Sequence, residues 1–408
     1  MTDVTPRLRS VEVLTVDHDG RRFLALRDPA GYTPAVLLLP LDLLEVVSLL
    51  DGEHTLVDIQ AAIMRHTGEL VYQADLEALV ATLDEHGFME STRFEEHRAA
   101  VDRGFLDAAT RPATHAGGAY PGEAEELRRT MEAFFAPPAG PGPIEWRDSS
   151  SPRVTAVIAP HIDFHRGGPA YAWAYHDLAE RSDADLFVVL GTCHAGMRDP
   201  FALTRKGYET PLGTLPVDVD FVEALAGRAR QDCFGSELAH RAEHSIEFQA
   251  VFLRHLFGAR REIAIVPVLT SFAQEALAAG SRADADPRVG RFLDALLETV
   301  AASGRRVGFI AGADLAHVGP RFGDGEPVSP PALAALDRED RALLRAVEAG
   351  DAEGFFEAVA RDGDRRRICG LSPIYTLLRA LGGAKGRLRH YGQWPDPQGV
   401  VTFASVVF

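Results

Sequence analysis

Three short apolar runs in the sequence are followed within a few residues by side chains that bind metals or transfer protons. The runs 154–158, 186–190 and 307–310 precede His161, His194, and the pair Asp314 and His317, respectively. A fourth run, 263–266, ends at Pro267. Such runs, rich in β-branched residues and separated by helical stretches, are typical of buried parallel strands. Open α/β sheets bind ligands at the carboxyl ends of their strands, so the sequence predicts a metal or redox site there.

A metal ion could be shared by two of these histidines. We expect His161 and His194 to end neighbouring strands, which lie about 4.8 Å apart in a parallel sheet. Cys369 is the leading candidate for a third ligand, because Ser372 and the proline after it are expected to cap and begin a helix. The helix dipole and the arginines at 365–367 would then favour the thiolate. Two histidines and one cysteine suit Fe(II), Cu or Zn and leave positions open for a substrate or oxygen.

Further groups near these strand ends could act as general acids or bases. His244 precedes an apolar helix, with Ser245 as its expected cap and His244 on the loop side, while Asp314 and His317 are expected to flank a short turn. A lone histidine at a strand end is more often a hydrogen-bonded structural residue, but three converging sites favour a functional role. Other residues are expected to be structural: His165, His176 and His255 on the surface or in packing, and Cys233 as a small buried residue. His115 is ambiguous from spacing alone.

The first 95 residues predict a small winged-helix-like α+β domain. Two strands, 11–16 and 23–26, are joined through Asp19-Gly20, a hairpin signal. Three helices follow, and Thr55 with Asp58 forms a capping box at the start of the second. The run 87–90 is expected to add a strand. A charged helical stretch from 92 to 115, including a linker at 96–110, then leads to an α/β domain at 111–408 with a mostly parallel central sheet flanked by helices.

Composition excludes several classes of function. The chain has 408 residues, 46% hydrophobic content and a net charge of −17, which argues against nucleic-acid binding. No apolar stretch approaches the roughly 20 residues that span a bilayer, and the first residues lack a signal-peptide pattern. Three cysteines without a C-x-x-C pair do not make a disulfide framework. The expected location is therefore the cytoplasm, away from membranes.

Eight motifs between 111 and 408 resemble the Memo family, which is related to the class III extradiol dioxygenases. They begin at Thr114, Ile158, Leu190, Tyr208, Glu243, Ile265, Gly312 and Ile368. The resemblance implies an extradiol-dioxygenase-like sheet, a metal centre of His161, His194 and Cys369, an acid/base role for His317, and a place for His244 in the same pocket. In the related dioxygenases the third ligand is a carboxylate, so Cys369 departs from their pattern. Asp163 stands where the family usually has another residue and would add a carboxylate near the metal.

Residues 41–91 resemble PqqD-like domains, whose members hold leader peptides for radical enzymes. Bacterial Memo-like proteins are associated with AMMECR1-like and radical-SAM proteins, so the two resemblances imply these partners and a peptide substrate held by the N-terminal module.

The leading hypothesis is a non-haem iron- or copper-dependent oxidoreductase. In it, His317 would shuttle protons while His244 and Asp314 orient the substrate. One alternative is a non-catalytic scaffold that binds a peptide or partner around a vestigial metal pocket. Another is a zinc hydrolase, since the same ligands could activate water.

Overall fold

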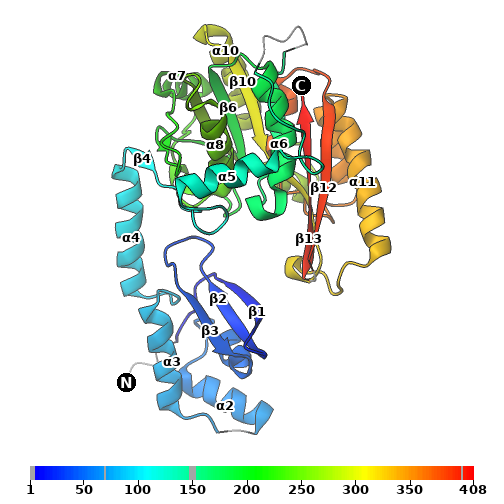
Figure 1. Ribbon diagram of the computed structural model, residues 1–408. Helices are drawn as coiled ribbons and strands as arrows, with labels where there is room; N and C mark the ends of the chain where they lie inside the picture. The colour runs from blue at the N-terminus through cyan, green and yellow to red at the C-terminus, as the bar shows by residue number, and fades with distance from the viewer. Residues whose placement is uncertain (1–4, 69, 147–152, 397) are drawn as a thin grey trace. The chain divides into compact units, whose positions relative to one another are not determined.

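The computed structural model describes residues 5–68, 70–146, 153–396 and 398–408 (Figure 1). The chain divides into two compact units, Met1–Asp107 and Ala108–Phe408. Unit 1 is a small α+β unit and unit 2 is an α/β unit with a large sheet flanked by helices, so the predicted fold class is confirmed. Among the described residues, no helix combines the length and apolarity needed to cross a membrane.

Unit 1 contains an antiparallel sheet of order β1-β2-β3 and a set of helices. Its elements are β1 (Glu12–His18), β2 (Arg21–Arg27), β3 (Val36–Pro40), η1 (Leu41–Leu43), α1 (Leu44–Ser48), α2 (Leu56–Thr67), α3 (Gln73–Glu85) and α4 (Thr92–Asp107). The predicted hairpin is present, and its two turn residues, Asp19 and Gly20, have φ values of 49° and 73°. Both values match the type I′ turn that suits the twist of a hairpin. The capping box of α2 is also present.

Two predictions for the N-terminal region are wrong. Residues 87–90 do not form a strand, since Met89 makes only an isolated bridge to Leu8. The third strand is instead β3, while Phe88 and Met89 are buried in the unit 1 core. The helical stretch ends with α4 at Asp107, and a two-residue strand, β4 (Thr110–Arg111), follows in unit 2.

The sheet of unit 2 has the order β11-β13-β5-β10-β6-β9-β7, with β12 also paired to β13. The four predicted strands are β5 (Ala156–Ala159), β6 (Leu186–Thr192), β9 (Ala264–Thr270) and β10 (Val307–Gly312), and they are mutually parallel. The other members pair antiparallel: β7 (Phe201–Leu203), β11 (Asp314–Val318), β12 (Arg387–Asp396) and β13 (Gly399–Val407). The sheet is therefore mixed around a parallel centre. β8 (Gly207–Tyr208) pairs separately with β4.

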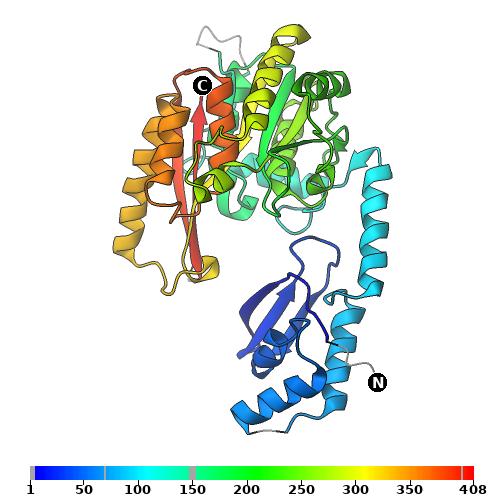
Figure 2. The same ribbon diagram turned by 180° about the vertical axis from the view of Figure 1, so that it is seen from behind.

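Helices cover both faces of this sheet. One layer comprises α5 (Ala124–Phe134), α6 (Phe164–Arg181) and α8 (His244–Phe257). The other comprises α7 (Val219–Ala229), α9 (Ala273–Ala278), α10 (Pro287–Ser303), α11 (Pro330–Glu348), α12 (Ala352–Ala360) and α13 (Leu371–Ala380). Figure 1 shows α5 and α6 in front of the strands, and Figure 2 shows α10 and α13 from the opposite side. Two short turns, η2 (Glu237–His240) and η3 (Pro320–Phe322), complete the unit.

Successive side chains of the parallel strands enter opposite cores. Val188 packs with the layer of α7, α10 and α13, whereas Phe187 and Val189 pack with α6 and α8. This alternation buries both faces of the strands, so the apolar runs read from the sequence are continuous.

Candidate metal centre

His161 lies immediately beyond β5 and is fixed by backbone groups and a carboxylate. Its side chain is 2% exposed. The Nδ1 atom lies 2.9 Å from the carbonyl oxygen of Gly312, to which it donates a proton, and the backbone N–H donates to Asp314 Oδ1 over 3.0 Å. Because Nδ1 carries the proton, the lone pair of Nε2 is free to bind a metal.

His194 lies beyond β6 and is held in the same way by a glutamate. Its Nδ1 atom is 3.0 Å and 3.1 Å from the two carboxylate oxygens of Glu243, and its backbone N–H donates to Oε2 over 2.9 Å. The carboxylate keeps the proton on Nδ1 and leaves Nε2 as the free ligand atom. Carboxylates and carbonyls hold metal-binding histidines in this manner in many metal sites.

Cys369 completes the predicted ligand set. Its Sγ atom lies 3.2 Å from His161 Nε2. One ligand atom from each of His161, His194 and Cys369 lies within 4.8 Å of the others. Zinc-like bonds of about 2.0–2.3 Å would bring such atoms to roughly 3–4 Å apart, so the donor set fits a small metal ion with modest adjustment.

The strands that carry the two histidines are not neighbours, which corrects the sequence prediction. β10 lies between β5 and β6. The imidazole rings nevertheless meet with centroids 4.8 Å apart. Gly312 ends β10 without a side chain, so the residues that follow the two outer strands converge above it.

A pair of glycines seats the N-terminus of α8 against the strand ends. Gly191 and Gly312 are register partners on β6 and β10. A Cβ atom on Gly191 would lie 2.6 Å from Ser245 Oγ, and one on Gly312 would lie 2.5 Å from the Ser245 carbonyl oxygen. The two glycines therefore let α8 begin beside the ligands and place Glu243 next to His194.

Ser245 does not cap α8, contrary to expectation. The capping side chain is Glu243, which accepts a bond from the Ser245 N–H over 3.0 Å. Ser245 Oγ instead donates to the Thr192 carbonyl oxygen over 2.9 Å. Glu243 was not predicted as a site residue, although it begins one of the eight motifs and stands directly before His244.

His244 lies against both histidines of the candidate ligand set. Its ring centroid is 4.7 Å from that of His194 and 5.2 Å from that of His161. His115 lies on its other side at 5.6 Å, with Nε2 within 3.0 Å of the Ala242 carbonyl oxygen. The ambiguous His115 is thus part of the same imidazole cluster.

Asp314 and His317 lie on β11 rather than around a turn. The Nδ1 atom of His317 is 3.1 Å from the Leu315 carbonyl oxygen and 3.2 Å from that of Arg367. The Nε2 atom of His317 is therefore the ring nitrogen that can gain or lose a proton. Asp314 is buried, and its Oδ2 lies 3.7 Å from His161 Nε2.

Burial dominates the ionisation of these groups. It lowers the pKa of His161 to about 3 and lowers that of His317 and, strongly, that of His244, so these imidazoles are neutral near pH 7. Burial also opposes charge on His194, but the Glu243 carboxylate outweighs it and raises the pKa. Burial raises the pKa of Asp314 to about 6.

The expectation of a thiolate favoured by the arginine run is wrong for the metal-free chain. Burial, followed by the charge of Asp314, raises the pKa of Cys369 well above its usual value. The arginines are engaged elsewhere: Arg366 with Asp340 over 2.6 Å and Arg367 with Asp324 over 2.6 Å. A bound metal ion would be the group that stabilises a Cys369 thiolate.

Ser372 also differs from its predicted role. Helix α13 begins at Leu371, so Cys369 does precede a helix, but Ser372 is inside it. The Ser372 hydroxyl accepts bonds from the backbone N–H groups of Phe272 and Ala273, over 3.3 Å and 3.0 Å. It therefore caps α9 rather than its own helix.

A buried ion pair holds the start of α8 in place, and it was not predicted from the sequence. Arg111 is fully buried and pairs with Glu247, which also accepts bonds from Tyr120 and from the His115 N–H. Arg111 Nη2 donates to the Glu243 carbonyl oxygen over 2.7 Å. The Glu243–Glu247 spacing of one helical turn was the available signal, since it puts both carboxylates at the start of α8.

Asp163, which was expected to add a carboxylate near the metal, does not lie among the candidate ligands. Asp163 pairs with Arg166 over 2.6 Å, and among the described residues it is in neither group able to hold a metal. Most residues that were expected to be structural do make packing or hydrogen-bond contacts. His165 contacts Trp394, His176 lies 3.2 Å from the Pro143 carbonyl oxygen, and Cys233 is buried in the core.

Comparison with known proteins gives a consistent family relationship. Residues 111–407 match the family described as Memo-like protein. A "MEMO1 family protein" of Aquifex aeolicus is 28% identical over 399 residues, covering 95% of this chain and 96% of that protein. One of Aeropyrum pernix is 31% identical over 293 residues, covering 70% of this chain and 93% of that protein. The first match therefore extends through most of both units.

Proposed function

Since the chain belongs to the Memo family, we propose that unit 2 is a metal-binding unit whose ligands are His161, His194 and Cys369. The proposal extends to a non-haem oxidoreductase that uses iron or copper, with zinc as the other candidate ion. The observation that carries it is the convergence of one ring nitrogen from each of two histidines and a thiol sulfur within 4.8 Å. Each imidazole is held through Nδ1 by an acceptor that suits a metal ligand.

The residues around the ligands supply binding and proton handling. A redox-active ion would supply electron transfer and a coordination position for a substrate or dioxygen. His317, whose Nδ1 is held by two carbonyl groups, would take up or release a proton at Nε2. Asp314 would orient His161 by accepting the His161 backbone N–H, and His244, whose ring lies beside that of His161, would contact the substrate.

A role for unit 1 in holding a peptide is a second proposal. Edge strand β3 carries two exposed apolar side chains, Val36 at 54% and Leu38 at 41%. Extended peptides pair with such edges. AMMECR1-like and radical-SAM proteins remain the partner classes that we propose, on the resemblance alone.

Elemental analysis of anaerobically purified protein tests the metal proposal. We expect near-stoichiometric iron or copper in the wild type and its loss in both His194→Ala and Cys369→Ser. Full occupancy by zinc, without oxygen consumption, would move the proposal to hydrolysis. No bound metal in the wild type, even after reconstitution with each ion, would refute the metalloenzyme and leave the peptide-binding scaffold.

A further inference from the structure

Glu243 lies beside the candidate metal centre, where it can share a three-ligand group with His194 and His244 but not with Cys369. Its side chain is 4% exposed. It accepts bonds from two backbone N–H groups, those of His194 and Ser245, and it lies beside two imidazole Nδ1 atoms. These are His194 Nδ1 at 3.0 Å and His244 Nδ1 at 3.3 Å.

We infer that Glu243 is a positioning residue that holds the ring proton of His194 on Nδ1 and thereby makes the site competent to bind metal. This inference rests on the proposed metal-binding function. A neutral imidazole that donates from Nδ1 to a carboxylate presents an unprotonated Nε2 on the other side of the ring. Because Nδ1 of His194 is bonded to Glu243, Nε2 is the ring nitrogen left to join His161 and Cys369, whose ligand atoms lie within 4.8 Å of one on His194.

The position of Glu243 is set by its neighbours rather than by its own flexibility. Its carbonyl oxygen accepts a bond from buried Arg111, and the residue after it begins α8 at the glycine pair described above. Its two carboxylate oxygens are fixed by the backbone N–H groups of His194 and Ser245, which donate to them over 2.9 Å and 3.0 Å. A charged acceptor binds an imidazole N–H more strongly than a neutral one does.

An amide at this position could not replace the carboxylate. Oε2 accepts the His194 N–H, and Oε1 accepts the Ser245 N–H. A glutamine has one acceptor oxygen and one NH₂ group, so either orientation sets NH₂ against a backbone donor. Glu243→Gln therefore removes the fixed acceptor for the imidazole protons with little change in volume.

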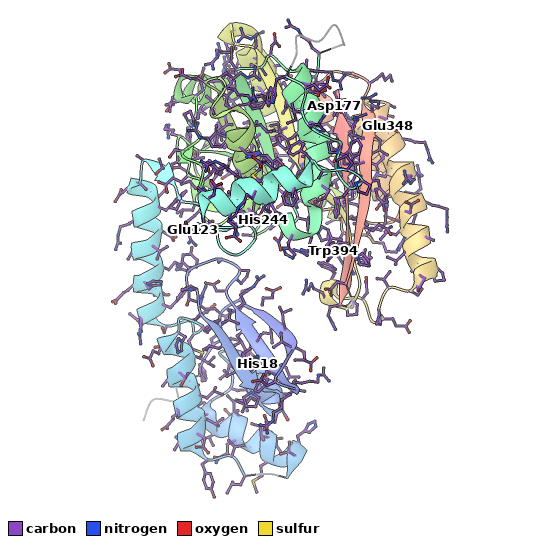
Figure 3. All side chains as sticks on the ribbon, in the orientation of Figure 1. His18, Glu123, Asp177, His244, Glu348 and Trp394 are labelled. Atoms are coloured by element: carbon purple, nitrogen blue, oxygen red, sulfur yellow. The ribbon has the colours of Figure 1, made fainter. Side chains whose placement is uncertain are left out.

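The test compares Zn²⁺ affinity in Glu243→Gln and in a matched control. Zinc is the probe because it binds histidine–cysteine sites without changing oxidation state. Asp177→Asn is the control, since Asp177 is also a buried carboxylate in an ion pair but lies on α6 with Arg181; Figure 3 labels Asp177 and His244. We expect Glu243→Gln to weaken Zn²⁺ binding about 10- to 100-fold in competition with a chromophoric chelator. The control should remain within about threefold of the wild type.

A second measurement separates this inference from the proposed function. Nitrogen-15 NMR of metal-free, histidine-labelled wild-type protein, recorded at alkaline pH where the His194 ring is neutral, reports which nitrogen of His194 carries the proton, with His194→Ala used to assign its signals. We expect the proton on Nδ1 in the wild type and a shift toward Nε2 in Glu243→Gln. A wild-type proton on Nε2, or equal Zn²⁺ affinity in Glu243→Gln and wild type, would overturn the positioning role. Failure of the wild type to bind any metal would instead overturn the proposed function, while the NMR result would still decide the orientation of His194.

Discussion

Breaking the buried pair of Asp340 and Arg366 should strongly destabilise unit 2. Asp340 is fully buried on α11, and Arg366 is 4% exposed. The carboxylate accepts bonds from Arg366 Nη1 over 2.6 Å, from Thr402 Oγ1 over 2.6 Å and from Tyr391 over 2.9 Å. Asp340→Ala removes the nearest partner and leaves a buried guanidinium with only the longer contacts to Glu339 at 3.5 Å and Asp362 at 3.7 Å. Breaking a buried pair in this way costs about 3–5 kcal/mol.

A control for this prediction lies one turn earlier on the same helix. Asp337 pairs with Arg341, but the two side chains are 38% and 50% exposed. Exposed pairs contribute about 0–1 kcal/mol, so Asp337→Ala should have little effect. The two substitutions delete the same chemical group from the same helix and differ in burial.

Urea unfolding followed by tryptophan fluorescence suits this comparison. The three tryptophans, Trp146, Trp173 and Trp394, all belong to unit 2, so their emission reports that unit. With a slope of roughly 3 kcal/mol per molar urea, the midpoint of Asp340→Ala should fall by about 1 M or more. A loss below about 1 kcal/mol, equal to that of Asp337→Ala, would refute the assignment of this cost to burial.

The pair should also affect the metal centre. The Arg366 carbonyl oxygen accepts the His317 N–H over 2.7 Å, so the segment that leads to Cys369 is attached to β11.

Burial raises the pKa of Asp340 in spite of its partners, which indicates that the net gain from the pair is small. Replacing both partners, as in Asp340→Leu with Arg366→Met, should therefore recover part of the stability that Asp340→Ala loses.

Three further predictions concern acid, packing and capping. Burial lowers the pKa of His240 to about 4, so as the pH falls below 6.5 the unfolded chain binds a proton before the folded chain does. The free energy of unfolding should therefore fall by up to about 3 kcal/mol between pH 6.5 and 4. His240→Gln should make this pH dependence less steep, and an unchanged pH dependence would contradict the prediction. Gly312→Ala should lower the free energy of unfolding in urea by about 1–3 kcal/mol because its Cβ meets the Ser245 carbonyl oxygen. Gly290→Ala has open space around it and should not lower the free energy of unfolding. Equal effects of the two substitutions would refute the packing argument. Thr55→Ala should destabilise α2 by about 1 kcal/mol, seen as faster amide exchange in that helix, and unchanged exchange would mean that the capping box contributes nothing.

The sequence was sufficient to predict the parallel centre of the sheet because its strands are buried on both faces. β13 is equally buried but pairs antiparallel with segments far away in the chain, and no local pattern reports such pairing. The run at 87–90 was apolar for another reason: Phe88 and Met89 fill the unit 1 core. Apolarity indicated burial in each case, but it did not identify the hydrogen-bonding partner.

For the candidate site, residue type predicted which side chains would meet but not what holds them. The convergence of His161, His194 and Cys369 agrees with their expected grouping. Hydroxyl groups were harder, since Ser245 and Ser372 each serve a different element from the one expected. Glu243 was missed because its role depends on the fold bringing α8 to the end of β6, which spacing along the chain does not encode.

The ligands of the proposed metal ion are distant in the chain, and this separation affects how long the folded protein would persist in the cell. His161 and Cys369 are separated by 208 positions, so a bound ion would act as a reversible cross-link closing a loop across most of unit 2. An ion that binds only the folded state adds about 4 kcal/mol of stability when its free concentration is a thousand times the dissociation constant. Metal supply would then control how long the folded protein survives proteolysis, and starvation for the ion would lower its abundance.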